Sequence, residues 1–168
     1  KEGIIMKFSI EKNVILDALN NVTRALSQKI TIPVLNGIKF ELTKDGLYLM
    51  ASDSELTIKV FIPEKEIKKV DKTGVVIIQS KYILDIIRKM PANEIDFEVM
   101  VVPTDETYPD YLAIEEIPIH IARQKAFAVE QVIGKEKMIL AADTLVVLHE
   151  NIIGKPKDRE DAIKILSN

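Results

Sequence analysis

One stretch limits what this chain can fold into: residues 93–111, with the sequence NEIDFEVMVVPTDETYPDY. Up to Val99, the residues have the character of a β-strand that follows a helix. From Val101 the sequence becomes an acidic segment interrupted by Pro103 and Pro109. The chain is therefore either one domain with an unusual loop, or two incomplete domains that meet within this stretch.

The first forty residues predict a strand and then an amphipathic helix. MKFSIEK alternates around Phe8 and Ile10, and Asn13 is placed to cap the following helix. Pro33 marks the latest point at which this helix can end. Four apolar residues are spaced as one stripe of the helix: Ile15, Leu19, Val22 and Leu26.

Three strands joined by turns are predicted next. GIKFEL, LYLMAS and LTIKVFI have the apolar alternation of half-buried strands, Asp45-Gly46 indicates a hairpin, and Asp53 marks a second turn. The order up to this point is β-α-β-β-β. We expect residues 65–74 to be a charged connector.

The same order then begins again and stops early. VVIIQ predicts a strand, Ser80 a helix cap, and Pro91 the end of a helix whose apolar face carries Ile83, Ile87 and Met90. EIDFEV is the next strand, and the two further strands needed for a second β-α-β-β-β unit do not follow. This weak repeat, cut short, favours a junction between two incomplete domains.

The remaining residues predict a different order of elements. After an acidic loop over 104–111, a helix begins near Pro118. Residues 137–148 predict a strand with Asp143 in its middle, HENIIGKP a turn and short extension, and Asp158 the cap of a last helix. The expected helical stripe consists of Ile119, Ala122, Ala126, Val129 and Ile133. This is an α/β pattern.

Composition excludes several classes of function. The 168 residues are 47% hydrophobic, have a net charge of −3 and contain no cysteine, so disulfides and cysteine-based zinc sites are excluded. We expect a cytoplasmic protein without a membrane span, because charged residues interrupt every apolar run. We also expect no signal peptide, since no apolar core follows Lys1. Both histidines, His120 and His149, are expected at the surface.

Residues 6–99 resemble the first domain of the bacterial DNA polymerase III beta sliding clamp. The similarity rests on MKFSIEKNVILDAL, TIPVLNGIKFEL, DGLYLMASDSELTI, FIP and IIQSKYILDIIRKMP, in that order. It implies a replication processivity factor that encircles duplex DNA as a ring of two three-domain subunits and catalyses no reaction. Its partners would be duplex DNA and replication proteins, through phosphate contacts that do not read sequence.

The clamp resemblance implies DNA contacts at particular basic residues. Lys29 matches a basic position of the family that touches DNA, and Arg24 and Lys12 lie near the same helix. The alternative for Lys29 is an ordinary lysine at a helix end, which interacts with the helix dipole or with solvent.

Residues 95–168 resemble an internal part of the Maf family of nucleoside triphosphate pyrophosphatases. The similarity rests on DFEVMVVPTDETYP, EEIPIHIARQKAFAVE, ILAADTLVVL and IIGKPKDREDAIKIL. It implies hydrolysis of nucleotides to monophosphate and pyrophosphate with Mg²⁺ or Mn²⁺.

The Maf resemblance assigns roles to four residues. Glu106 and Asp143 would hold the metal, and Asp143 would also serve the attacking water as the catalytic carboxylate. Lys125 and Lys155 would face the substrate phosphates. These residue types suit the reaction, because phosphoryl transfer requires charge neutralisation and Mg²⁺ prefers oxygen ligands. The alternative for Asp143 is a strand-end aspartate bonded to nearby backbone amides, because burying an unpaired carboxylate within the apolar run 138–148 is costly.

Both resemblances are partial. The Ser-Pro-Arg-Arg signature that binds nucleotide phosphates in the Maf family does not occur in these 168 residues. The final strands of the clamp domain, and its further domains, have no counterpart either. IDFEV, residues 95–99, satisfies the strand patterns of both families at once, so we place the junction there.

The predicted fold is α+β: an incomplete clamp domain, β-α-β-β-β then β-α-β, over 6–99, joined to an incomplete α/β Maf-like segment over 95–168. Residues 137–148 either pack against or extend the first sheet, or the two halves are separate lobes. Three functions remain open: a clamp-type DNA scaffold, with a second copy of the chain as a further partner; a nucleotide pyrophosphatase impaired by the missing phosphate loop; and a fused chain with neither activity.

Overall fold

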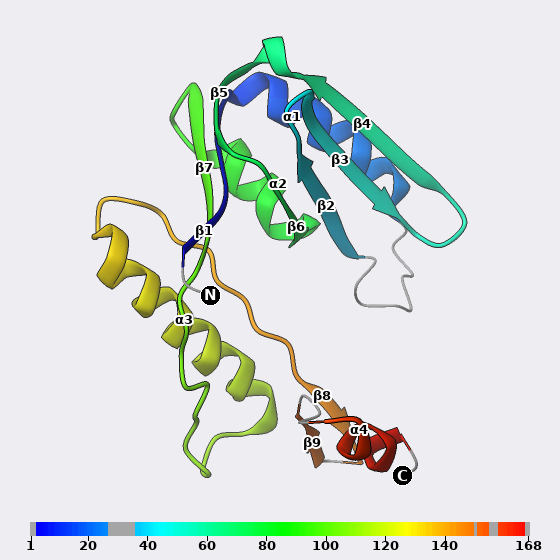
Figure 1. Ribbon diagram of the computed structural model, residues 1–168, viewed down its shortest axis with the longest axis vertical. Coiled ribbons are helices and arrows are strands. Elements are labelled where there is room, and N and C mark those ends of the chain that lie inside the picture. The colour runs from blue at the N-terminus through cyan, green and yellow to red at the C-terminus, as the bar shows by residue number, and fades with distance from the viewer. Residues whose placement is uncertain (1–2, 27–35, 150, 155–157, 167–168) are drawn as a thin grey trace. The chain divides into compact units, whose positions relative to one another are not determined.

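The computed structural model describes residues 3–26, 36–149, 151–154 and 158–166. It divides into two compact units: an N-terminal unit, Glu2–Val101, and a C-terminal unit, Val102–Asn168 together with Lys1. The fold is of the mixed α+β kind (Figure 1). In the part of the chain that the structure describes, no helix has the length and apolar character that crossing a membrane requires.

The N-terminal unit contains seven strands and two α-helices among its described residues. In chain order they are β1 (Gly3–Glu11), α1 (Lys12–Val22), the 3₁₀ turn η1 (Thr23–Ala25), β2 (Gly37–Leu42), β3 (Gly46–Ser52), β4 (Thr57–Pro63), the 3₁₀ turn η3 (Glu64–Glu66), β5 (Ile67–Lys72), β6 (Gly74–Gln79), α2 (Ser80–Lys89) and β7 (Glu94–Val101).

The strands form two antiparallel sheets, with strand orders β5-β1-β7 and β4-β3-β2-β6. In the first sheet, Phe97 of β7 lies opposite Phe8 of β1, and Ile95 lies opposite Ile10. β7 is therefore built into the N-terminal unit along nearly its whole length. The strand in which we placed the junction is part of this sheet.

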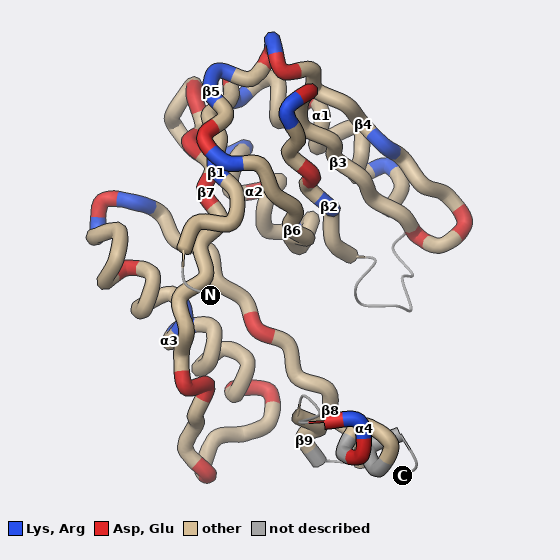
Figure 2. Tube along the Cα trace, viewed as in Figure 1, with Lys and Arg blue, Asp and Glu red and all other residues tan. Residues whose placement is uncertain are grey.

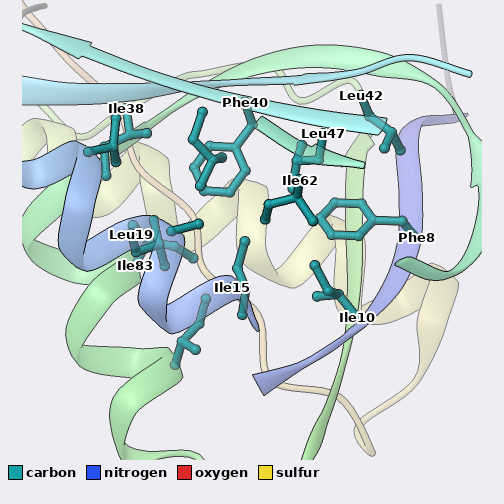
Figure 3. Packing of buried hydrophobic residues seen from close by; sticks show 14 of the residues in the cluster. Phe8, Ile10, Ile15, Leu19, Ile38, Phe40, Leu42, Leu47, Ile62 and Ile83 are labelled. Carbon is teal, nitrogen blue, oxygen red and sulfur yellow. The ribbon is translucent and has the colours of Figure 1, made fainter. Parts of the chain in front are cut away.

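Apolar side chains from both sheets and both helices meet in one core. Phe8, Phe40 and Leu19 are at most 1% exposed, and Figure 3 shows them among isoleucine and leucine side chains of α1, α2 and the strands. The ring of Phe97 lies 5.0 Å from that of Phe8 and 5.6 Å from that of Phe40. The core contains residues from both ends of the unit, so many of its contacts join positions that are far apart in the sequence.

The predicted helices are present, but their caps differ from the sequence expectation. α1 begins at Lys12 and ends at Val22, so Asn13 lies inside its first turn. α2 begins at Ser80, and its cap position is Gln79, whose side chain makes no capping hydrogen bond. The expectations for Asn13 and Ser80 are therefore wrong by one or two residues, since each strand runs directly into its helix. Pro33 lies outside the described residues.

Both predicted turns are confirmed. Gly46 begins β3 with φ +149°, and a Cβ there would lie 2.2 Å from the carbonyl oxygen of Ile62, so only glycine fits. In the turn between β3 and β4, a carboxylate oxygen of Asp53 accepts hydrogen bonds from the amides of Glu55 and Leu56, at 3.1 and 2.9 Å. These bonds lower the pKa of Asp53.

The expected charged connector over 65–74 is wrong in part, because it contains β5. β5 pairs antiparallel with β1 and has a register irregularity on each side of Phe8 and Ser9. The irregularity allows Ile67 and Val70, three residues apart, to pair with the same face of β1, which hides the two-residue period of a strand. β5 ends the strand order of its sheet, and its lysines and aspartate suit such an edge. Charged residues of both signs follow one another along it in Figure 2.

The C-terminal unit contains the 3₁₀ turn η4 (Ile114–Glu116), α3 (Ile117–Ile133), β8 (Val146–Leu148), β9 (Asn151–Ile153) and α4 (Arg159–Leu166). Pro118 lies in the first turn of α3, as predicted. α4 begins directly after Asp158, at the predicted cap position. β8 and β9 pair antiparallel as a two-stranded sheet.

Two expectations for this unit need correction. Residues 138–145 have no strand structure, and only Val146–Leu148 of the predicted strand pairs, with β9. The expectation that 137–148 extends the first sheet is therefore wrong. The helical stripe is also displaced: Ile117 and Ile121 are buried, whereas Ile119 is 54% exposed. An apolar run cannot form a strand without a partner, and Met138 and Leu140 of this run are exposed.

Candidate functional site

Three of the predicted Maf-type residues lie together in the C-terminal unit. The Lys125 Nζ lies 2.5 Å from the Asp143 Oδ1 and 3.0 Å from the Glu106 Oε1. Glu106 comes from the loop that follows β7, Lys125 from α3, and Asp143 from the segment between α3 and β8. Residues that are up to 37 positions apart therefore converge on one ammonium group.

The cluster is partly shielded from water. The side chain of Asp143 is 13% exposed, that of Lys125 29%, and that of Glu106 40%. Burial alone would lower the pKa of Lys125, but hydrogen bonds to Asp143 and Glu106 outweigh it, so this pKa lies above its usual value. Lys125 is accordingly a cation at neutral pH, held between two carboxylates.

The loop that carries Glu106 is held by a neighbour of Lys125. The side-chain amide of Gln124 donates a hydrogen bond to the carbonyl oxygen of Thr107 at 2.8 Å, and its nitrogen also lies 3.2 Å from the His120 Nε2. Glu106 has φ +50°, in the left-handed region, which costs a residue with a side chain on the order of 1 kcal/mol. Contacts from α3 thus hold a backbone conformation that the loop would rarely adopt alone.

The donor set of the cluster fits a hard cation. Two carboxylates face one positively charged group, and Mg²⁺ is commonly held by one or two carboxylates with water completing its coordination. Among the described residues, no group of three or more His, Cys, Asp or Glu side chains is arranged to hold a metal ion. Any metal here would therefore rest on Glu106 and Asp143, and would displace the ammonium of Lys125 from at least one of them.

Other predicted residues are less informative. Lys155 and Lys29 lie outside the described residues. Arg24 is exposed, in the 3₁₀ turn at the end of α1. The ammonium of Lys12 donates a hydrogen bond to the carbonyl oxygen of Met90 at 2.5 Å, and so links α1 to the residue after α2.

The sequence did not identify two participants of the cluster. The Maf resemblance assigns no role to Gln124 or to the carbonyl of Thr107, although each is adjacent in sequence to a residue that it singles out. His149 is exposed, as expected, but His120 is only half exposed and contacts Gln124. The expectation that His120 lies at the surface holds only in part, because this half-buried side chain also contacts Gln124 one turn further along α3.

Two family models match the chain, each over more than half of its residues. The DNA polymerase III beta subunit N-terminal domain matches residues 6–105, and Maf-like protein matches residues 79–168. The two matches overlap over residues 79–105, which include α2 and β7.

Relatives with curated descriptions agree with the first match. The Beta sliding clamp of Bacillus subtilis (strain 168) is 35% identical over 98 residues, which are 56% of this chain and 26% of that protein. A Beta sliding clamp of Staphylococcus epidermidis is 34% identical over 95 residues, 54% of this chain and 25% of that protein. The chain thus spans about a quarter of the length of these relatives.

Solved structures show the same fold. The DNA polymerase III beta chain of Streptococcus pneumoniae TIGR4 is similar with a TM-score of 0.53 and 26% identity, over 66% of this chain and 34% of that chain. The DNA polymerase sliding clamp of Bacillus subtilis gives a TM-score of 0.52 and 28% identity, over 67% and 35%. The fold of the N-terminal unit is that of a sliding-clamp domain.

The chain belongs to the DNA polymerase III beta subunit N-terminal domain family through residues 6–105, and to the Maf-like family through residues 79–168.

Proposed function

We propose that the N-terminal unit contributes a clamp-type, sequence-independent contact with duplex DNA during replication. The observation that carries this proposal is the fold of the described residues of the N-terminal unit, in which two sheets and two neighbouring helices close around one apolar core. The named relatives are beta sliding clamps. Replication proteins and a second copy of this chain are the partners that follow from the proposal.

The proposed contact is weak and electrostatic. Arg24 is exposed at the end of α1, whereas Arg88 of α2 is paired with Asp85 at 3.6 Å. Figure 2 shows acidic positions interspersed with basic ones along this unit, and the whole chain has a net charge of −3. A few phosphate contacts without base contacts permit sliding, because they carry no sequence information.

A salt titration tests this proposal. We expect fluorescence anisotropy with a 30-base-pair duplex (a length of about three helical turns) to show affinity that falls as salt rises, equally for unrelated sequences. Arg24→Ala should reduce the slope of log affinity against log salt by about one. Lys44→Ala, which removes a charge from the exposed turn between β2 and β3, is the matched control. No salt-dependent binding, or equal effects of both variants, would refute the proposal.

The second candidate function is metal-dependent hydrolysis of nucleoside triphosphates by the C-terminal unit. The contact of Lys125 with Glu106 and Asp143 favours it, because the three residues are those to which the Maf resemblance assigns roles. Mg²⁺ or Mn²⁺, held by the two carboxylates, would supply a Lewis acid and lower the pKa of a bound water. Lys155 remains the proposed second phosphate ligand.

The residues of the cluster divide the work of this reaction. Asp143, the more buried carboxylate, would orient the attacking water and accept its proton as the water attacks the α-phosphorus and pyrophosphate leaves. Glu106 would share the metal. Lys125 keeps the two carboxylates aligned when no substrate is present, and then neutralises charge on the phosphate oxygens. Its raised pKa keeps it charged while it is paired with the two carboxylates.

Pyrophosphate release from several nucleotides, with Mg²⁺ and then Mn²⁺, tests the second candidate. We expect Asp143→Asn to lower the rate by about 10²–10³-fold, since it removes a charge that acts on the reacting groups. Asp110→Asn, at an exposed position near the end of the same loop, should leave the rate unchanged. Absence of release from the unchanged protein would refute this candidate and favour a fused chain without this activity.

The domain division is part of the same proposal. An incomplete clamp domain over 6–99 and an incomplete Maf-like segment over 95–168 share the strand residues 95–99. The overlap of the two family matches supports this division.

A further inference from the structure

We infer that Gln124 is a positioning residue, which holds the loop carrying Glu106 in the geometry that the carboxylate–lysine cluster requires. This inference rests on the proposed nucleotide hydrolysis, but the contact on which it depends can be tested separately. Gln124 is not among the residues to which the Maf resemblance assigns a role.

The first step of the argument is the geometry of the tether. Gln124 donates from its Nε2 to the Thr107 carbonyl at 2.8 Å, across 17 positions of sequence. That carbonyl lies one residue beyond Glu106, whose own carboxylate reaches Lys125 at 3.0 Å. Two adjacent residues of α3 therefore hold two adjacent residues of the loop, one by its backbone and one by its side chain.

The second step is that the tether sets the orientation of the amide. The Gln124 Oε1 is buried, and within the described residues it meets no hydrogen-bond donor. The opposite orientation would place an oxygen against the Thr107 carbonyl, so that two acceptors would face each other. The amide nitrogen thus makes a hydrogen bond to the loop, while the amide oxygen is left without a donor, which is unfavourable for stability. This arrangement does not stabilise α3 itself, so the folding of the helix does not explain it.

The third step concerns the backbone that is held. Glu106 adopts φ +50°, a region that residues with side chains occupy rarely. The loop from Pro103 to Pro109 has no regular secondary structure of its own. Without the tether, Glu106 would relax to commoner backbone angles, and its carboxylate would lose its contact with Lys125.

A protease assay measures how strongly Gln124 holds the loop, and it requires no nucleotide. A glutamyl endopeptidase cleaves after glutamate, and the Glu106–Thr107 bond directly precedes the Thr107 carbonyl to which Gln124 donates. Glu136, exposed beyond α3, provides an internal reference site. In Gln124→Met we expect cleavage after Glu106, relative to Glu136, to rise about five- to tenfold, as loss of one hydrogen bond predicts. Gln131→Met, the same change at an exposed position of α3, is the control and should behave as the unchanged protein.

Activity measurements then test the positioning role. With Mg²⁺ and the four common ribonucleoside triphosphates, we expect Gln124→Met to lower kcat about tenfold and to change KM less than twofold. The unfolding midpoint should stay within error, because the substitution also removes a buried acceptor that lacks a donor.

Each outcome has a defined meaning. Cleavage after Glu106 that is no faster in Gln124→Met than in Gln131→Met overturns the inference, whatever the activity. Faster cleavage with unchanged kcat in an active protein overturns the positioning role. If the unchanged protein releases no pyrophosphate, the proposed hydrolysis fails, and the protease assay alone decides whether Gln124 holds the loop.

Discussion

Substitution of Phe97 by alanine tests whether β7 contributes to the core of the N-terminal unit. Phe97 is half-buried, and its ring centroid lies 5.0 Å from that of Phe8 and 5.6 Å from that of Phe40, nearly parallel to the latter at 3°. If β7 belonged instead with the residues that follow it, the substitution would leave the N-terminal unit unaffected.

The expected magnitude follows from these contacts. Replacing a fully buried phenylalanine by alanine costs about 3–5 kcal/mol, and each aromatic pair contributes about 0.5–1.5 kcal/mol beyond burial. Because Phe97 is only half-buried, we expect the free energy of unfolding to fall by about 2–3 kcal/mol. With an m-value of about 1.5 kcal/mol per molar urea, the midpoint would fall by roughly 1.3–2 M.

Hydrogen exchange as a function of urea, read by mass spectrometry, is the suitable assay. The chain has no tryptophan, and peptides report the two units separately. Peptides of residues 3–26 and 36–101 should lose protection at lower urea in Phe97→Ala, whereas those of 102–149 should not change. Phe127→Ala, at a ring that is 64% exposed on α3, is the matched control and should change neither. Loss of protection confined to 102–149 would refute the placement of β7.

Two further predictions concern the turn at Gly46 and the charge of Lys125. Gly46→Ala should destabilise the N-terminal unit by about 3 kcal/mol in urea unfolding, because its Cβ would overlap the Ile62 carbonyl. Gly154→Ala is the control and should be neutral, since no atom lies within 4 Å of the added Cβ. An equal loss of stability in both variants would contradict the steric reason. The raised pKa of Lys125 means that its ion pairs stabilise the C-terminal unit fully below the unfolded pKa of about 10.4, and that this contribution is lost as pH rises through the folded pKa. The stability difference between the unchanged protein and Lys125→Met should therefore be constant from about pH 7 to 9 and shrink above about pH 10. A difference that shrinks at lower pH would contradict the raised pKa of Lys125. Lys135→Met, at an exposed position, serves as the control.

The sequence predicted well those elements in which local and tertiary preferences agree. β2 and β3 alternate regularly around Asp45-Gly46, and their pairing places Phe40 opposite Leu49, as a hairpin with this turn requires. β5 was missed because its register irregularity separates Ile67 from Val70 by three residues. A pattern of period two cannot reveal a strand whose period changes within six residues.

The opposite error occurred at residues 137–148. Their apolar character is that of a buried strand, but a strand also needs a neighbour with free backbone groups, and sequence does not show whether one is available. Asp143 nevertheless has a partner, as a carboxylate in an apolar run requires unless it lies at a strand end or is functional, and this partner is Lys125. The role of Gln124 depends on a contact with a backbone carbonyl, which any residue type could supply, so no sequence pattern could have indicated it.

β7 also has a consequence for the order in which the chain folds during synthesis. Residues 95–99 fit the strand patterns of two families, but Ile95, Phe97 and Val99 pack against one core, and a side chain cannot fill two cores at once. The ribosome releases β1 before β7, and both before any residue of 102–168. The strand can therefore pair with β1 while the later segment is still being made, so the direction of translation favours the first of the two strand patterns that residues 95–99 satisfy.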